Sequence, residues 1–270
     1  MLPATLTARQ QREIDFYKDY AQRQRVSSID FDPVLGHEQR PWNPYWYVYQ
    51  LVKQRYVSRK QRLLDYGCGI GIASARFARL GYQVDGFDIS EENLAVADDL
   101  AAKYQLASRC HFAPMTAENL NYEDNSFDML VGIDILHHID IQKSIEEAYR
   151  VLRPGGVAIF KEHIEAPIFE PIRQSSVGRW IAPNETSQDD HITDDERKLN
   201  NDDMTAINGI FDRVEEKRFT VVSRVDRMIP QCSVGMRARL QQLDHYLMKA
   251  CPPIRNLGGT VVLTCHKSHL

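Results

Sequence analysis

The sequence lacks several features that define large classes of protein. No apolar run approaches the ~20 residues needed to span a bilayer, and the amino-terminal region is polar, unlike the apolar core of a secretory signal. The 5 cysteines are odd in number and show no C-x-x-C spacing, which argues against a disulfide framework and gives no metal-ligand pattern. We therefore expect a cytoplasmic protein with no membrane span and no metal.

A surplus of basic residues is also missing. The formal net charge is −4, whereas an extended nucleic-acid surface favours a basic stripe. With 270 residues, of which 43% are hydrophobic and 26% charged, the chain has the composition of an ordinary globular domain with elaborations. We expect a small-molecule substrate and no nucleic-acid partner, and the composition leaves the oligomeric state open.

The most informative segment that is present covers residues 63–71, Leu-Leu-Asp-Tyr-Gly-Cys-Gly-Ile-Gly. It reads as a buried strand that ends in an acid, followed by three alternating glycines and a helix. Glycine permits positive φ and close approach of a ligand to the backbone, and the helix start offers unpaired N–H donors. The segment therefore predicts a cradle for a nucleotide-sized ligand.

Two kinds of ligand, a dinucleotide or a cationic amino-acid ligand, could occupy this cradle. A dinucleotide fingerprint, G-x-G-x-x-G or G-x-G-x-x-A, has a small residue at its sixth position, where this chain has Ile72. Asp65, just before the first glycine, would repel a pyrophosphate but would attract a cationic amino-acid ligand. The pattern disfavours a dinucleotide-dependent oxidoreductase.

A second acid lies at the end of the next predicted strand. Asp88 follows Gly67 by 21 positions, close to the ~20-residue spacing at which a carboxylate meets a ribose. Two carboxylate oxygens suit two vicinal ribose hydroxyls. Ser90 is the expected N-cap of the helix that follows, and Gly81 is expected to end the preceding helix.

Three further segments follow in order. Residues 115–120 precede a Phe-Asp pair that opens an apolar strand, residues 134–139 read Asp-Ile-Leu-His-His-Ile, and residues 152–156 read Leu-Arg-Pro-Gly-Gly. Together with the D-x-G-x-G-x-G pattern, these segments resemble the motifs of class I S-adenosylmethionine-dependent methyltransferases of small-molecule type, over residues 60–165.

The resemblance implies S-adenosyl-L-methionine as cofactor. It also implies a set of cofactor-binding residues, in which Thr116 stands where the family usually has Asp: Asp65, Gly67, Cys68, Gly69, Gly71, Asp88, Ile89, Thr116, Ala117 and Ile133.

Alternating strand and helix patterns predict an α/β fold with a mostly parallel sheet covered on both faces. The resemblance specifies a Rossmann-like sheet of seven strands, with the last strand, 260–266, antiparallel between the fifth strand and the sixth, which is expected at 217–223. Residues 1–60 are expected to form a helical N-terminal extension, and 61–270 the methyltransferase domain. Insertions at about 164–202 and 230–256 are expected to form, with the extension, a cap over the substrate.

Aromatic residues are concentrated in the N-terminal extension. As candidates for the substrate pocket we single out Trp42, Tyr45, Trp46 and Tyr17. Such rings could close over a sulfonium or clamp an apolar acceptor. The alternative, which we expect for most of them, is that they pack the extension onto the core.

The expected chemistry is an in-line displacement at a methyl carbon, in which an oxygen nucleophile of high pKa needs a base. His138 and His137, just after the fourth strand, are candidate bases, and Glu162 and His163 are rivals. Asp134 is expected to serve the cofactor or the helix start.

The sequence thus predicts a small-molecule O-methyltransferase. The alternatives are an N-methyltransferase acting on an amine or amino sugar, and a non-catalytic S-adenosylmethionine-binding protein.

Overall fold

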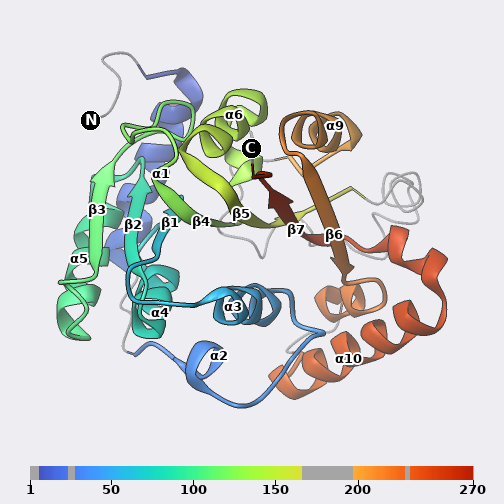
Figure 1. Cartoon of the computed structure of the whole chain (residues 1–270). Coiled ribbons are helices and arrows are strands. Elements are labelled where there is room, and N and C mark those ends of the chain that lie inside the picture. Colours follow the sequence, from blue (N-terminus) through green and yellow to red (C-terminus); the bar gives the residue numbers. More distant parts are fainter. Residues whose placement is uncertain (1–5, 24–27, 166–196, 229–231, 270) are drawn as a thin grey trace.

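A single mixed β-sheet organises the computed structural model, which describes residues 6–23, 28–165, 197–228 and 232–269, with the side chains of 16–23 and 227–228 left out. The strand order is β3-β2-β1-β4-β5-β7-β6 (Figure 1). The strands are β1 (Arg62–Tyr66), β2 (Gln83–Asp88), β3 (Cys110–Pro114), β4 (Phe127–Ile133), β5 (Leu152–His163), β6 (Arg213–Phe219) and β7 (Thr260–His266).

The sheet confirms the predicted seven-stranded, mostly parallel topology. Strands β1 to β5 pair in parallel, and β7 pairs antiparallel with both β5 and β6. β7 keeps its predicted bounds because its side chains are almost all buried, as a near-continuous apolar run requires.

Strand β6 begins four residues earlier than the sequence analysis placed it, at Arg213 rather than Lys217. It is an edge strand with charged, partly exposed side chains, so its sequence lacks an apolar pattern. The apolar residues after Phe219 leave the sheet at Thr220, whose φ is 60°. Their backbone amides at 221–223 donate to the buried carboxylate of Asp244 instead.

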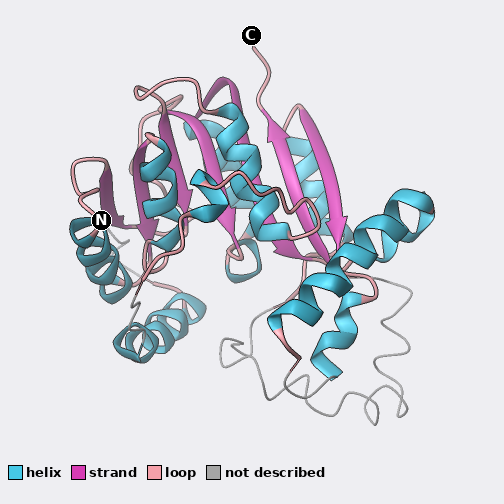
Figure 2. Ribbon diagram, turned by 90° about the horizontal axis from the view of Figure 1, so that it is seen from below, coloured by secondary structure: helices cyan, strands magenta, loops and turns pink. Residues whose placement is uncertain are grey.

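Helices cover both faces of the sheet, as predicted (Figures 1 and 2). One apolar cluster joins α3, α4 and α5 to one face, and another joins α6 and α9 to the opposite face. The α-helices are α1 (Ala8–Arg23), α2 (Asp32–Leu35), α3 (Pro44–Arg55), α4 (Ile72–Leu80), α5 (Glu91–Lys103), α6 (Ile141–Val151), α9 (Asn201–Ile210) and α10 (Val234–Ala250). Short 3-10 helices are η1 (Leu136–His138), η2 (Ser223–Met228) and η3 (Pro252–Leu257).

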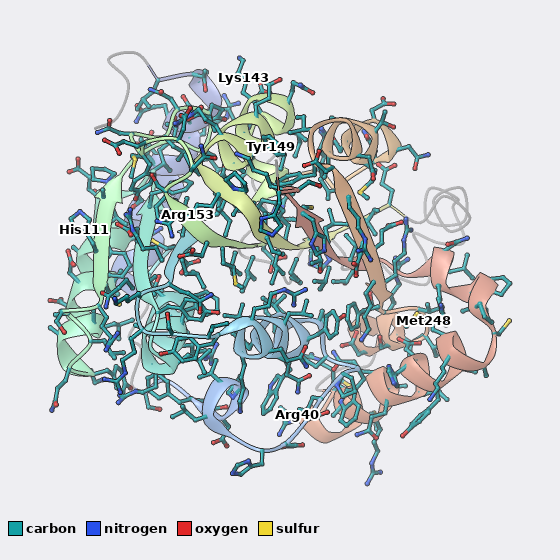
Figure 3. All side chains as sticks on the ribbon, in the orientation of Figure 1. Arg40, His111, Lys143, Tyr149, Arg153 and Met248 are labelled. Carbon is teal, nitrogen blue, oxygen red and sulfur yellow. The ribbon has the colours of Figure 1, made fainter. Side chains whose placement is uncertain are left out.

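The helix ends follow local chemistry that the sequence already shows. Gly81 ends α4 in the left-handed region with φ 119°, and the Ser90 side chain accepts a hydrogen bond from Asn93 N at the start of α5. Helix α6 buries one face and exposes the other, on which Lys143 points outward in Figure 3. These features fix where the strand-to-helix loops begin, and those loops carry the site.

The described part of residues 1–60, the expected N-terminal extension, contains the helices α1, α2 and α3. Of the expected insertion at 164–202, residues 166–196 lie outside the described part, whereas the insertion at 230–256 contains α10 and η3. Among the described residues, we find no helix with the length and apolarity that a membrane crossing requires.

Candidate functional site

A cavity of about 550 Å³ opens at the carboxyl ends of β1, β2 and β4, within the size range of small-ligand sites. This is the edge at which open α/β sheets bind ligands. Nine of the ten predicted cofactor residues line it: Asp65, Gly67, Cys68, Gly69, Asp88, Ile89, Thr116, Ala117 and Ile133.

The glycine turn between β1 and α4 forms the floor of the cavity. Gly67 and Gly69 have φ of 72° and 51°, a region that other residues avoid. A Cβ on Gly67 would lie 2.5 Å from the Ile135 side chain, so glycine also keeps the cavity wall close.

Gly71, the tenth predicted cofactor residue, does not line the cavity. It caps the N-terminus of α4 with φ 78°, and a Cβ there would lie 2.7 Å from the Cβ of Ala97 in α5. In this structure Gly71 therefore allows α4 and α5 to pack closely.

Asp65 is buried at the end of β1, where its Oδ2 accepts a hydrogen bond from Ser74 Oγ at 2.5 Å. Burial raises the pKa of Asp65 to about 7, and the negative charge of Asp88 acts in the same direction. A buried carboxylate of this kind is stabilised by a cation. The residue thus fits the ammonium group at the methionine end of S-adenosylmethionine.

Asp88 is held by donors from three directions. Its Oδ2 accepts from Gly69 N at 3.0 Å, and its Oδ1 accepts from Ser90 N at 2.9 Å and Asn93 Nδ2 at 3.2 Å. Burial raises the pKa of Asp88 against these hydrogen bonds. The contacts fix the carboxylate toward the cavity, which fits the predicted role with a ribose.

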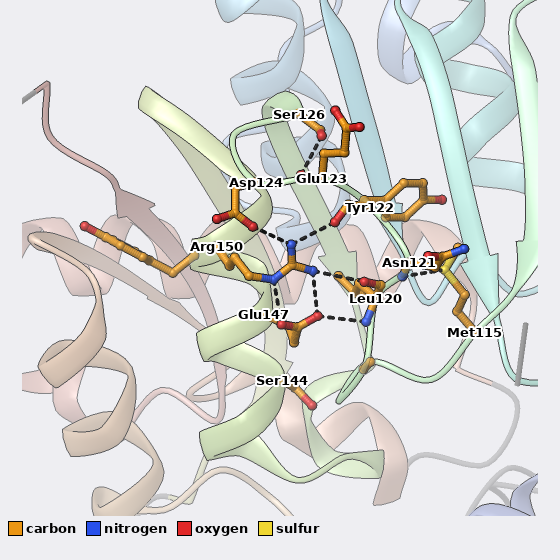
Figure 4. Close-up of polar contacts among 12 residues, drawn as sticks. Met115, Leu120, Asn121, Tyr122, Glu123, Asp124, Ser126, Ser144, Glu147 and Arg150 are labelled. Carbon is orange, nitrogen blue, oxygen red and sulfur yellow. Dashed lines mark hydrogen bonds and ion pairs between the residues drawn. The ribbon is translucent and has the colours of Figure 1, made fainter. Parts of the chain in front are cut away.

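The loop after β3, which carries Thr116 and Ala117, is anchored from α6 (Figure 4). The Arg150 guanidinium donates to the carbonyl oxygens of Leu120 and Tyr122 at 2.9 and 2.7 Å. Glu147 pairs with Arg150 at 2.8 Å and accepts from Leu120 N at 2.8 Å. Sequence reasoning missed this anchor, because Arg150 resembles any basic residue in the last turn of a helix.

The two candidate histidines have different surroundings. His138 lines the cavity, and its Nδ1 lies 3.1 Å from Oε1 of Glu13 in α1. His137 faces a second cavity, of about 370 Å³, and its Nδ1 lies 2.8 Å from Oε2 of Glu162. The ring centroids are 4.0 Å apart. Only His138 therefore combines a place on the cofactor cavity with a carboxylate partner.

The rival bases do not line the cavity. Glu162 is fully buried, and its Oε1 accepts hydrogen bonds from Ile135 N and Leu136 N, both at 2.7 Å. It thereby fixes the turn that carries both histidines. His163 ends β5 and pairs with Thr260 of β7. This geometry favours a supporting role for Glu162.

Of the aromatic candidates, Tyr45 lines the cavity, whereas Trp42 and Trp46 do not. Trp46 is buried, and the Arg40 guanidinium lies 4.2 Å from the centroid of its ring. The side chain of Tyr17 lies outside the described part of the chain. The contact shown for Trp46 is thus with another residue of the extension.

Further residues that line the cavity were not among the predicted site residues. Gln10 and Glu13 reach it from α1, Tyr49 from α3 and Arg76 from α4. Arg76 Nη1 donates to Tyr49 Oη at 2.9 Å. No local pattern distinguishes such residues from surface residues of amphipathic helices.

Comparisons with known proteins agree with this geometry. A family model described as "Methyltransferase domain" matches residues 64–160. A ubiquinone biosynthesis O-methyltransferase from a Caulobacter species is 35% identical over 127 residues, 45% of this chain and 50% of that protein. A protein of the same description from Paraburkholderia phymatum is 30% identical over 63% of this chain and 71% of its own length.

Structural similarity extends over nearly the whole chain. Geranyl diphosphate C-methyltransferase from Streptomyces coelicolor, solved with S-adenosyl-L-homocysteine, superposes with a TM-score of 0.56. The superposition covers 98% of this chain and all of that one, at 12% identity, which establishes the fold alone. The sequence match to the Caulobacter relative, in contrast, spans about half the length of that protein.

Fold, strand order and cavity define a class I methyltransferase domain. The chain belongs to the S-adenosylmethionine-dependent methyltransferase family, whose methyl donor is S-adenosyl-L-methionine. Within the part of the chain that the structure describes, no cluster of three or more His, Cys, Asp or Glu residues is arranged to hold a metal ion.

Proposed function

We propose that this protein transfers a methyl group from S-adenosyl-L-methionine to a hydroxyl group of a small molecule. The observation that carries the proposal is the His138–Glu13 pair on the wall of the cavity that also contains Asp65 and Asp88. The O-methyltransferase descriptions of the Caulobacter and Paraburkholderia relatives support a hydroxyl acceptor.

Each residue of the site would have a separate role in the reaction. Asp65 would bind the ammonium group of the cofactor and Asp88 its ribose, with the glycine turn beneath them. When bound, S-adenosylmethionine supplies a methyl group on a sulfonium, which is a good leaving group. His138 would take the proton from the acceptor hydroxyl as its oxygen bonds to the methyl carbon. The carboxylate of Glu13 would stabilise the resulting imidazolium.

The N-terminal extension would form part of the cap. Helix α1 reaches the site at three residues: Arg9 donates to the carbonyl oxygen of His138, Gln10 Nε2 donates to Glu118 Oε2 at 3.2 Å, and Glu13 contacts His138. Closing the cavity in this way would exclude water from the reaction. The insertions at 164–202 and 230–256 remain proposed parts of the same cap, and a cytoplasmic location is proposed from the cysteine pattern.

The direct test is a methyl-transfer screen with labelled S-adenosylmethionine against phenol, carboxylate, amine and thiol acceptors. Label in a hydroxyl product is expected. Label in an amine would replace the proposal with N-methylation. Cofactor binding by calorimetry with no transfer to any acceptor class would favour a non-catalytic binding protein. Absence of binding would refute the proposal entirely.

A further inference from the structure

Three polar side chains from distant parts of the chain meet beside the cavity. Tyr45 comes from α3, Asp134 from the turn after β4, and Lys161 from β5. Tyr45 Oη donates to Asp134 Oδ2 at 2.8 Å, and Lys161 Nζ lies 2.5 Å from Asp134 Oδ1 and 3.3 Å from Tyr45 Oη. The ammonium also lies 4.4 Å from the centroid of the Tyr45 ring. The proposed transfer mechanism uses none of the three.

Burial and charge fix the protonation states of this group. Lys161 is only 1% exposed, so its charge depends on the partners around it. Burial alone would raise the pKa of Asp134, but the charge and hydrogen bond of Lys161 outweigh it and lower that pKa. Burial and the neighbouring Asp134 raise the pKa of Tyr45. Near neutral pH Asp134 is therefore a carboxylate and Tyr45 a protonated phenol.

The carboxylate in this group faces the ligand space. Asp134 and Tyr45 line the cavity, and Lys161 stands behind them. A carboxylate offers about four acceptor positions, and the Tyr45 and Lys161 contacts occupy two of them. Asp134 can therefore accept another hydrogen bond from a molecule in the cavity.

The backbone of Asp134 is also held in an unusual conformation. Its φ of 56° lies in the left-handed region, and its N–H donates to the carbonyl oxygen of Lys161 at 2.9 Å. Non-glycine residues in this region are strained, and they cluster at ligand sites. Lys161 thus fixes both the backbone and the side chain of a strained acid directed at the cavity.

We propose that Asp134, supported by Tyr45 and Lys161, accepts a hydrogen bond from a second hydroxyl next to the one that is methylated. This inference rests on the proposed O-methylation. His138 lies four positions further along the same turn and lines the same cavity. In the proposed arrangement, one hydroxyl of a vicinal pair meets His138 and the other meets Asp134. The preferred acceptors are therefore vicinal diols or ortho-dihydroxy aromatic molecules.

The charges around the cavity also indicate which dihydroxy compounds the protein would accept. The acids Glu13, Asp65, Asp88 and Glu118 line it together with Asp134, and among the described residues Arg76 is the cation on that lining apart from histidine. Such a lining favours the cationic cofactor and disfavours an anionic acceptor. Neutral dihydroxy compounds should therefore be better acceptors than their carboxylated analogues.

The test compares catechol, 2-methoxyphenol and phenol as acceptors for the full-length protein. The wild type should prefer catechol to both other compounds by about tenfold or more in kcat/KM, because an analogue without the second donor loses a hydrogen bond to the half-buried carboxylate of Asp134. Asp134→Asn should reduce this preference to about threefold or less. Its S-adenosylmethionine Kd should stay within about twofold of the wild type.

Two milder variants test the supporting residues. Tyr45→Phe keeps the ring over Lys161 but removes the phenol, and Lys161→Met removes the counter-charge. In each variant, the preference for catechol in kcat/KM should lie between that of the wild type and that of Asp134→Asn. Asp140→Asn is the matched control, since this acid caps α6 six residues further along and should leave the preference unchanged.

The outcomes separate this inference from the function on which it rests. Equal use of catechol and phenol by the wild type, or an unchanged preference in a folded Asp134→Asn protein, would overturn the role of Asp134 and leave O-methylation standing. Transfer to none of the acceptors in the full screen would overturn both.

Discussion

The two halves of the cavity are built in different ways. The half at the ends of β1 and β2 consists of neighbours in sequence: Asp65, the glycine turn and Asp88 lie within 65–88. The half at the end of β4, which β5 supports from behind, is assembled from distant segments. The Glu13–His138 contact joins positions 125 apart, and Tyr45–Asp134 joins positions 89 apart. Local motifs therefore specify the first half, whereas tertiary packing specifies the second.

This difference predicts separate effects for mutations in each half. Changes around β1 and β2 should alter cofactor affinity, and changes around β4 and β5 should alter turnover or acceptor choice with the cofactor still bound. A mutation that affected both equally would show that the halves are coupled.

The largest effect is expected for Asp65→Asn. It removes the buried anion that would meet the ammonium of the cofactor, while an amide can still accept from Ser74. S-adenosylmethionine affinity should fall by about a hundredfold or more, because charge-assisted contacts in a buried site are strong. Isothermal titration at pH 8 measures this loss.

The raised pKa of Asp65 should make both cofactor affinity and protein stability depend on pH, in opposite directions. With a pKa of about 7 in the folded protein and 3.8 as reference, the folded state holds a proton that the unfolded state releases between those values. The contribution of Asp65 to stability without cofactor should therefore decrease as pH rises from 4 to 7, while affinity for the cofactor increases through pH 7.

Asp65→Asn should remove the part of both pH dependences that comes from Asp65. Without cofactor it should be more stable than the wild type at pH 8, by on the order of 2 kcal/mol, and similar to it at pH 4. Urea unfolding at the two pH values is the measurement. A stability difference between the wild type and Asp65→Asn that is the same at pH 4 and pH 8 would contradict the raised pKa of Asp65.

The second largest effect is expected for His138→Gln. Loss of the proposed base should lower kcat by about a hundredfold or more, with the S-adenosylmethionine Kd within about threefold of the wild type. His137→Gln is the matched control, because His137 bonds to Glu162 away from the cavity. Equal loss of kcat in the two variants would assign the effect to the turn rather than to a base.

These contrasts also explain what the sequence could predict. The topology, the antiparallel β7 and the residues around the glycine turn followed from local patterns and a family resemblance. Lys161 and Glu162 both lie in β5, yet one supports Asp134 and the other supports the histidine turn. The two roles differ because neighbouring side chains point to opposite faces of a strand and because their partners lie far away in the sequence. Local patterns therefore could not predict them. For Gly71, the motif predicted a cofactor-binding residue, whereas in the structure this glycine lies against Ala97 of α5 and does not line the cavity.

The smallest effect is expected for Arg150→Met, which acts on the cofactor half from a distance. The variant loses the hydrogen bonds to Leu120 and Tyr122 that anchor the loop of Thr116 and Ala117, but keeps much of the apolar stem of Arg150. Cofactor affinity should weaken by about three- to tenfold, because the loop must be ordered on binding. The kcat at saturating cofactor should change little.

Arg153→Met serves as the control for Arg150→Met. Arg153 also bonds to a backbone oxygen and to an acid, Asn125 and Asp128, but neither lies on the cavity. Its loss should lower stability without changing the cofactor Kd. Binding that is equally weak in both variants would mean that the loop is held by the stability of the whole domain. Weaker binding in Arg150→Met alone would show that a residue outside the cavity positions the cofactor half through its loop.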